Sequence, residues 1–259
     1  MIRTSQSDLS NLFKALRIPV SGTVMLHAAL FSLGLIEGGV KGFYDALRKH
    51  LGEEGTIIVP TFCYSYRRNE IYDVEKTPSA KSIGIFSEYV RKKIDSVRSL
   101  DPMFSMAAIG PMASSLMERK SKASFGPDSI YEELFNHDAI FIGIGITYST
   151  GLTGFIHLEK LSDVPYRQDL VLRGRSRLLD GSECDDYAIH YARNEDFFIN
   201  AQTNRESMGA LLESCGVSTE INYGYSKHMS LSGPAWQEIV VSELKKDPFC
   251  MLQFNSIKI

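Results

Sequence analysis

The chain has 259 residues, of which 44% are hydrophobic and 23% charged, an ordinary composition for a soluble globular protein. This length is long for one domain and short for two, so we expect a single elaborated domain over residues 1–259. Lys and Arg number 28 against 31 Asp and Glu, with no basic stripe, which argues against nucleic acid as a partner. No apolar run reaches the roughly 18 residues of a spanning helix, so no membrane partner is expected.

The cysteines and the first residues predict a cytoplasmic protein without a metal site. Cys63, Cys184, Cys215 and Cys250 are scattered, with no CxxC pair and no zinc-ligand spacing, so we expect reduced thiols. The segment Met1–Asp8 lacks the apolar stretch of a signal peptide.

The first half of the chain predicts alternating helices and strands. The order strand, helix, strand suggests a parallel sheet with crossover connections. A polar loop over residues 64–82 follows the carboxyl end of a strand, where such sheets place ligands. In chain order, we expect a helix capped by Ser7 and Asp8, a strand at Thr23–His27, a helix from Gly38-Gly39 to Gly52, a strand at Thr56–Pro60, a helix around Ile85–Ile94 and a strand at Met106–Gly110.

The second half continues this pattern and changes after Pro165, where antiparallel strands at a sheet edge are predicted. The sequence thus indicates an α/β fold with a mostly parallel central sheet and an antiparallel edge. The expected elements are a helix capped by Asp128, a strand at Ala139–Ile146, edge strands at Leu170–Leu172 and Cys184–Tyr191 around an Asp180-Gly181 turn, helices around Glu206–Cys215 and Pro234–Lys245, and a last strand at Phe249–Leu252.

His157 is the first candidate for chemistry. It closes the run Thr153-Gly-Phe-Ile-His157, near Glu159 and a Pro-Tyr-Arg corner, shortly after a buried strand. An imidazole there could accept a proton near neutral pH. A lone histidine is also often structural, and the residues alone leave both interpretations open.

Three other segments are candidates for ligand contacts. The turn His27–Gly34 ends a strand with small residues that let a ligand approach the backbone, or it is an ordinary turn with a core histidine. Thr61 offers a hydroxyl at the next strand end, and Tyr64 and Tyr66 could line a cleft. Arg98 could bind an anion such as phosphate, or pair with Asp101.

Several familiar catalytic motifs are absent from the sequence. The run Gly143-Ile-Gly145 lacks the third glycine of a dinucleotide fingerprint. There is also no Walker A sequence, no H-E-x-x-H helix and no G-x-S-x-G elbow.

Taken in this order, the segments resemble the aminoglycoside 3-N-acetyltransferase family, also called the antibiotic N-acetyltransferase fold. The resemblance covers nearly the whole chain, including the closing segment Lys246–Leu252. The matching motifs are His27–Gly34, Gly55–Phe62, Thr77–Ser79, Arg98–Gly110, Phe125–Ser129 and Thr153–His157.

The resemblance implies a three-layer α/β/α enzyme that uses acetyl-CoA to acylate an amine directly in a ternary complex, without an acyl-enzyme. It implies His157 as the base that takes the amine proton. The residues that would line the pantetheine tunnel and the thioester are His27, Ala28, Ala29, Leu30, Phe31, Thr61, Ser79, Phe104 and Ser105.

The chemistry agrees with this role. An alkylamine with a pKa near ~10 is mostly protonated at pH 7 and cannot attack a thioester. A positioned base contributes typically ~10²–10⁴-fold, and hydrogen-bond donors must hold the developing oxyanion. Thr61 and the loop after His27 are candidate donors.

The sequence departs from the family pattern in two places. Glu159 is the candidate catalytic carboxylate beside His157, but the family commonly shows His-x-x-Glu, whereas Glu159 lies two positions after His157, and residues two apart on a helix do not face one another. Asp163 or Glu37 could be the partner carboxylate instead. Ala28 and Ala29 also replace two hydroxyl residues and leave only main-chain hydrogen bonds for the cofactor.

Two amino-sugar acceptors remain open: an aminoglycoside antibiotic, or a biosynthetic sugar linked to a nucleotide or destined for a polysaccharide. A polycationic antibiotic needs an acidic cleft, and the acids of Glu183–Asp186 look like a solvated edge strand. The loop Tyr64–Arg68, with its tyrosines and with Arg67 and Arg68, slightly favours the biosynthetic sugar. Tyr64, Tyr66 and Asp163 are the expected substrate contacts.

Two hypotheses from other classes are a hydrolase with Ser105 as nucleophile and His157 as base, and a non-catalytic coenzyme A-binding member of the fold. The missing elbow argues against the hydrolase. The sequence does not fix the oligomeric state, and a homodimer is one option.

Overall fold

The computed structural model describes residues 1–68, 70–118, 120–198 and 200–255. Its centre is a seven-stranded sheet with the order β12-β13-β8-β2-β4-β7-β6. The strands are β2 (Thr23–Ala28), β4 (Thr56–Pro60), β6 (Val97–Arg98), β7 (Met106–Ile109), β8 (Ile140–Ile144), β12 (Ser218–Tyr223) and β13 (Ser226–Ser232).

Parallel pairing occupies the middle of this sheet. Strand β2 pairs in parallel with β4 on one side and with β8 on the other, as the predicted crossover order requires. The pairs outside this trio, β13 with β8, β12 with β13, β4 with β7 and β6 with β7, are antiparallel. The predicted α/β class with antiparallel edges is therefore confirmed.

Helices cover both faces of the sheet because side chains alternate along each strand. In β2, Val24 and Leu26 face one hydrophobic cluster, and Met25 faces the other. The first cluster takes α1 (Gln6–Ala15), α2 (Gly39–Leu51) and α3 (Ile85–Arg91). The second takes α4 (Ala113–Leu116), α5 (Ile130–Asn136), α6 (Gly154–Leu161), α8 (Glu206–Ser214) and α9 (Gly233–Lys246).

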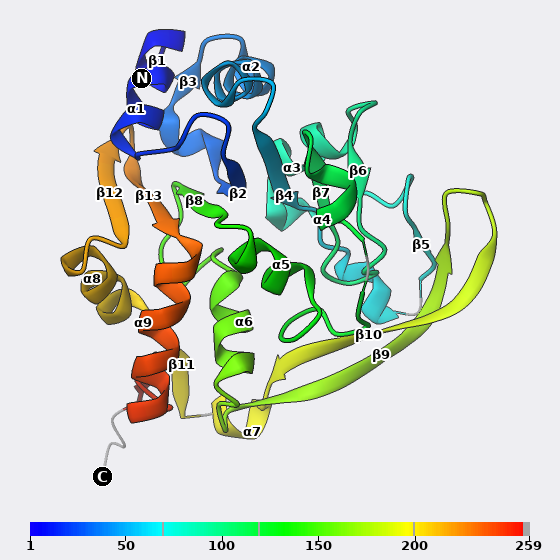
Figure 1. Ribbon diagram of the computed structural model, residues 1–259. Coiled ribbons are helices and arrows are strands. Elements are labelled where there is room, and N and C mark those ends of the chain that lie inside the picture. The colour runs from blue at the N-terminus through cyan, green and yellow to red at the C-terminus, as the bar shows by residue number, and fades with distance from the viewer. Residues whose placement is uncertain (69, 119, 199, 256–259) are drawn as a thin grey trace.

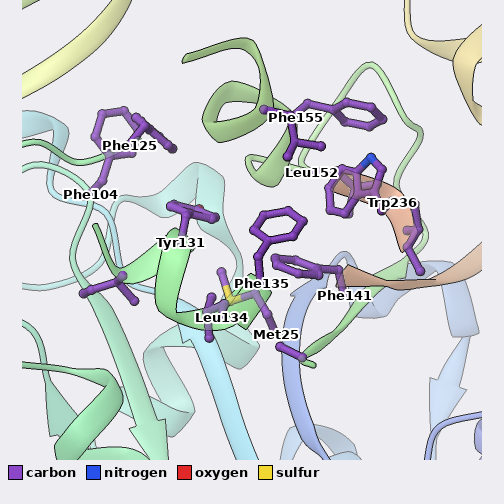
Figure 2. Close-up of a cluster of buried hydrophobic side chains, with 14 of the residues drawn as sticks. Met25, Phe104, Phe125, Tyr131, Leu134, Phe135, Phe141, Leu152, Phe155 and Trp236 are labelled. Atoms are coloured by element: carbon purple, nitrogen blue, oxygen red, sulfur yellow. The ribbon is translucent and has the colours of Figure 1, made fainter. Parts of the chain in front are cut away.

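The second cluster is rich in aromatic side chains and lies between α5, α6, α9 and the sheet. Figure 2 shows Phe135, Phe141 and Trp236 lying together, with Phe155 nearby and Tyr131 on the side toward Phe104 and Phe125. The ring centroids of Phe141 and Trp236 are 5.1 Å apart in an edge-to-face arrangement. This packing fixes α6, the helix that carries the predicted base.

The strands predicted at the sheet edge form a separate arm instead. Strands β9 (Arg167–Arg177) and β10 (Glu183–Arg193) make an antiparallel hairpin, and β5 (Tyr72–Asp73) pairs with β9. Figure 1 shows this hairpin leaving the body of the molecule near α6 and reaching toward β5. The antiparallel edges of the central sheet are β12 with β13 on one side and β7 with β6 on the other, and of these four strands only β7 was predicted from the sequence.

Helix starts also differ in detail from the prediction. Ser5, rather than Ser7, caps α1, and Asp8 completes a capping box with it. Ser129, rather than Asp128, caps α5, because its side chain accepts the amide of Glu132. The predicted last strand lies slightly later, as β14 (Leu252–Phe254), which pairs with β11 (Ala201–Thr203).

The short elements are β1 (Arg3–Thr4), η1 (Leu30–Leu33), β3 (Leu35–Ile36), η2 (Tyr64–Arg68), η3 (Lys81–Ile83) and α7 (Glu195–Phe198). Among the described residues, no helix combines the length and the apolarity that crossing a bilayer requires.

Candidate active site

Two pockets meet at the carboxyl ends of β2 and β8. The first, here called the loop pocket, has a volume of about 580 Å³ and is lined by residues 27–31 and 81–85. The second, called the hairpin cleft, has a volume of about 700 Å³ and lies against the base of the β9–β10 hairpin. Tyr64, Gly151 and Thr153 line both, and we call these three residues the junction.

Close backbone contacts shape the loop pocket. At Gly145, which follows β8 with φ +66°, a Cβ would lie 2.1 Å from Ser32 Oγ in η1. At Gly84, with φ +100°, a Cβ would lie 2.9 Å from the carbonyl oxygen of Ala28. Both glycines therefore let the turn after β2 lie directly against its neighbours. The five residues predicted for the cofactor loop, His27–Phe31, all line this pocket.

His27 connects the loop pocket with the junction. Its Nε2 lies 3.1 Å from Thr153 Oγ1, and that hydroxyl also bonds the hydroxyl of Tyr131. Among the described residues, His27 Nδ1 has no hydrogen-bond partner. Burial lowers the pKa of His27 to about 3, so the ring is neutral at physiological pH.

His157 lies deeper, on α6, and is 0% exposed. Its Nδ1 accepts the Gly126 amide at 3.1 Å, so Nε2 carries the proton of the neutral ring, and no described residue accepts it. The ring stacks on Phe135 with centroids 5.1 Å apart, and burial lowers its pKa to about 3. His157 is not among the described residues that line the two pockets, although Thr153, the N-cap residue of α6, lies only four positions before it.

Glu159 makes its contacts with arginines rather than with His157. It is fully buried, with its Oε2 2.6 Å from Arg167 Nε and its Oε1 2.9 Å from Arg205 Nη2. Tyr166 also donates its hydroxyl to Oε1 at 3.2 Å. Burial alone would raise the pKa of Glu159, but Arg205 and Arg167 hold it below its usual value. Glu159 is thus a stable carboxylate in an ion cluster.

The alternative carboxylates also lie elsewhere. Glu37 accepts the backbone amide of Gln6 at 3.2 Å, far from α6 in the sequence and on the other face of the sheet. Asp163 follows the end of α6 with φ +47° and does not line the hairpin cleft among the described residues. The partner of His157 found in the structure is a backbone amide.

Thr61 and Ser105, which were expected to line the cofactor tunnel, are not among the described residues that line the two pockets. Both are 0% exposed, and Ser105 donates its hydroxyl to the Thr61 carbonyl at 2.7 Å. Arg98 donates hydrogen bonds to the Thr61 carbonyl at 2.8 Å and to Ser105 Oγ at 3.2 Å. Its guanidinium therefore holds a loop carbonyl and a buried hydroxyl in place. Asp101 instead accepts the amides of Met103 and Phe104. The described hydrogen bonds of Arg98 do not include the alternative partner Asp101.

The remaining predicted contacts divide between the pockets and the core. Tyr64 lies at the junction, and Phe104 lines the hairpin cleft rather than the loop pocket. Ser79 donates to Glu88 Oε2 at 2.9 Å and lines neither pocket in the described part of the chain. Tyr66 is buried and donates its hydroxyl to the Asp186 carbonyl of β10. The side chains of Arg67 and Arg68 lie outside the described residues.

The sequence analysis missed the residues that the hairpin and α8 bring to the cleft. His190, Arg193 and Arg205 all line it, and His190 lies 4.7 Å from Phe104 between ring centroids. Side chains alternate along a strand, so the two-residue spacing in the predicted strand already places His190 on the same face as Ala188, and both are buried in the structure. No comparable pattern identifies Arg205, which reaches the cleft from the start of α8.

Comparison with known proteins agrees with this architecture. The family model described as aminoglycoside 3-N-acetyltransferase matches residues 25–245. Aminoglycoside N(3)-acetyltransferase VII of Streptomyces paromomycinus is 27% identical over 214 residues, which cover 73% of this chain and 74% of that protein. A prophage-derived aminoglycoside N(3')-acetyltransferase-like protein of Bacillus subtilis is 24% identical over 69% of this chain and 72% of its own.

Solved structures share the fold at low identity. AAC-IIIb in a binary complex with CoASH matches with a TM-score of 0.81 and 18% identity, over 99% of this chain and 100% of that chain. A mutant of the aminoglycoside acetyltransferase AAC(3)-IVa in complex with a gentamicin has a TM-score of 0.81 and 20% identity, over 97% of this chain and 92% of that chain. The chain is a member of the aminoglycoside 3-N-acetyltransferase family.

Proposed function

We propose that this protein transfers an acetyl group from acetyl-CoA directly to an amino group of an amino sugar. The observation that carries the proposal is the junction, where Tyr64, Gly151 and Thr153 line both pockets. Two substrates that enter from separate pockets and meet at one wall can react in a ternary complex without an acyl-enzyme.

The loop pocket fits the pantetheine arm of the acyl donor, which supplies the activated thioester. The arm is narrow and carries amide groups, and the pocket offers apolar walls from Leu30, Ile83 and Ile146. The buried Nδ1 of His27, which has no hydrogen-bond partner among the described residues, is a polar atom that a bound ligand would satisfy. Ala28 and Ala29 leave the backbone open to close approach.

The transfer step requires a proton acceptor at the junction. The amine nitrogen bonds to the acyl carbon, the carbon–sulfur bond breaks, the sulfur leaves as a thiolate, and the amine proton goes to a base. The Thr153 hydroxyl, held between His27 and Tyr131, is in place to donate to the developing oxyanion.

Two imidazoles compete for the role of base. The family motif assigns it to His157, and that role stays a prediction, because the ring must gain access to the junction when substrates bind. His27 already lines the loop pocket and hydrogen-bonds Thr153, so it is the second candidate for the base.

The hydrolase hypothesis has less support. Ser105 is 0% exposed, donates to the Thr61 carbonyl and lines neither pocket in the described part of the chain. A nucleophilic serine must reach its substrate and bond a base, whereas the hydroxyl of Ser105 contacts Thr61, Cys63 and Arg98.

Substituting each imidazole tests the proposal. We expect His157→Gln to lower kcat/KM for acetyl transfer by ~10²–10⁴-fold while binding of coenzyme A persists, because a base acts in the chemical step. We expect His27→Gln to raise mainly the KM for acetyl-CoA. The measurement is release of free thiol from acetyl-CoA with glucosamine and gentamicin as acceptors, with the product confirmed by mass.

The exposed His137 at the end of α5 provides the matched control, since His137→Gln removes an imidazole outside both pockets. Thermal unfolding of each variant separates misfolding from loss of catalysis. If His27→Gln loses most of its kcat while His157→Gln remains active, the general base is His27 and not His157. Coenzyme A binding without acetylation of any amine would contradict the proposed activity.

A further inference from the structure

The floor of the hairpin cleft holds a buried ion cluster with unequal charges. Arg167 and Arg205, with side chains 4% and 5% exposed, share the single carboxylate of Glu159, which is 1% exposed. Both arginines line the cleft. Two guanidiniums against one carboxylate leave one positive charge without a counter-charge within the cluster.

The other charged groups at the cleft do not cancel this excess at depth. Arg193 adds a third cation to the wall, and its guanidinium stacks 5.0 Å from the Phe198 ring. Glu195 and Asp196 line the rim and are exposed. Glu206 accepts the Ser149 amide at the same rim. The exposed charges, Arg193 as well as the carboxylates, are screened by water and salt, whereas the buried guanidiniums of Arg167 and Arg205 interact in a low dielectric.

Two details indicate that the arginines repel one another and lack a full set of partners among the described residues. Burial, and then repulsion from Arg205 and Arg193, lower the pKa of the Arg167 guanidinium, although Glu159 opposes this. Arg205 Nε is a buried donor with no hydrogen-bond partner among the described residues. An anion in the cleft would relieve the repulsion among these guanidiniums.

We propose that the acceptor of this enzyme carries an anionic group, a phosphate or a carboxylate, in addition to the amine that is acetylated. The anion binds between Arg193 on the cleft wall and Arg205 on the cleft floor, and the amine lies toward the junction. This inference rests on the proposed acetyltransferase activity. It also disfavours a polycation without an anionic group, since such an acceptor brings its charges against buried arginines.

Matched acceptors test the inference. Glucosamine provides the amine alone, glucosamine 6-phosphate adds a phosphate, 2-amino-2-deoxygluconic acid adds a carboxylate, and gentamicin provides a polycation. We expect at least one anionic acceptor to have a kcat/KM about tenfold or more above that of glucosamine, falling as salt rises. The preferred anion identifies which of the two groups the cleft binds.

Arg193→Gln tests the cleft itself, because Arg193 is exposed and its loss leaves the buried cluster intact. We expect kcat/KM to fall about tenfold more with the anionic acceptor than with glucosamine, because glucosamine carries no anion for this guanidinium to bind. The control is Arg173→Gln, an exposed arginine on the same hairpin that does not line the cleft among the described residues. Thermal shift with glucosamine 6-phosphate, in the absence of acetyl-CoA, gives a readout independent of catalysis.

The possible outcomes distinguish failure of the anionic-acceptor proposal from failure of the proposed acetyltransferase activity. Equal rates with glucosamine and its anionic analogues, or the highest rate with gentamicin, would overturn the anionic acceptor and leave the acetyltransferase intact. A rise in the KM of acetyl-CoA alone in Arg193→Gln would also overturn it, because the arginine would then bind coenzyme A phosphates. No acetylation of any amine would instead reject the underlying activity.

Discussion

At the level of single residues, the contacts of each buried polar group decide what that group does in the site. Glu159 was predicted beside His157 and instead holds two arginines, while the Nδ1 of His157 accepts a backbone amide. A buried carboxylate needs such partners, because desolvation of an isolated charge is costly. Glu159 thus builds the floor of the cleft.

We expect Glu159→Gln to destabilise the protein by about 3–5 kcal/mol, because it leaves two buried guanidiniums without a counter-charge. Urea unfolding at pH 7 measures this change. Asp169→Asn is the control, since Asp169 pairs with Lys160 near the surface and should cost about 1 kcal/mol or less. Equal stability of the two variants would contradict the assignment of Glu159.

At the scale of elements, the sequence predicted those whose pattern is local. Helix α2 lies between the predicted glycines, and β2 and β4 occupy nearly the predicted ranges. Apolar strand runs and glycine stops are encoded within a few residues, so they can be read without tertiary contacts.

The sequence could not show where β9 and β10 would pair. Their residues pattern as strands, but only tertiary contacts decide between an edge of the central sheet and a separate arm with β5. The same limit applies to the site. The loop at His27–Phe31 was predictable from its local motif, whereas Arg193 and Arg205 come to the cleft through the hairpin and α8.

At the scale of the whole molecule, buried neutral histidines connect stability to pH. Burial lowers the pKa of His27 and His157 from 6.5 to about 3, and it also lowers the pKa of His228. In the unfolded chain these rings would titrate near 6.5, so the unfolded state binds more protons below that pH. The stabilising contribution of His27 and His157 is therefore present above pH 6.5 and is lost as the pH falls toward 3, and that of His228 is lost in the same direction.

We expect the free energy of unfolding to decrease between pH 6.5 and 5, with a slope of up to about 1.4 kcal/mol per pH unit for each of these imidazoles. Urea unfolding across this range measures the slope, before the carboxylates of lowered pKa begin to contribute. His157→Gln should reduce the slope by one imidazole. A stability that is constant from pH 7 to 5 would show that these rings are accessible to solvent protons in the folded state.

The proposed reaction requires the acetyl donor and the amine acceptor to enter separate pockets and to meet at Tyr64, Gly151 and Thr153. A crystal structure of the complex with coenzyme A measures this directly. The account predicts the pantetheine arm along His27–Phe31, with its sulfur beside Thr153 and the hairpin cleft still open. Coenzyme A lying in the cleft against Arg193 and Arg205, with the loop pocket empty, would contradict it.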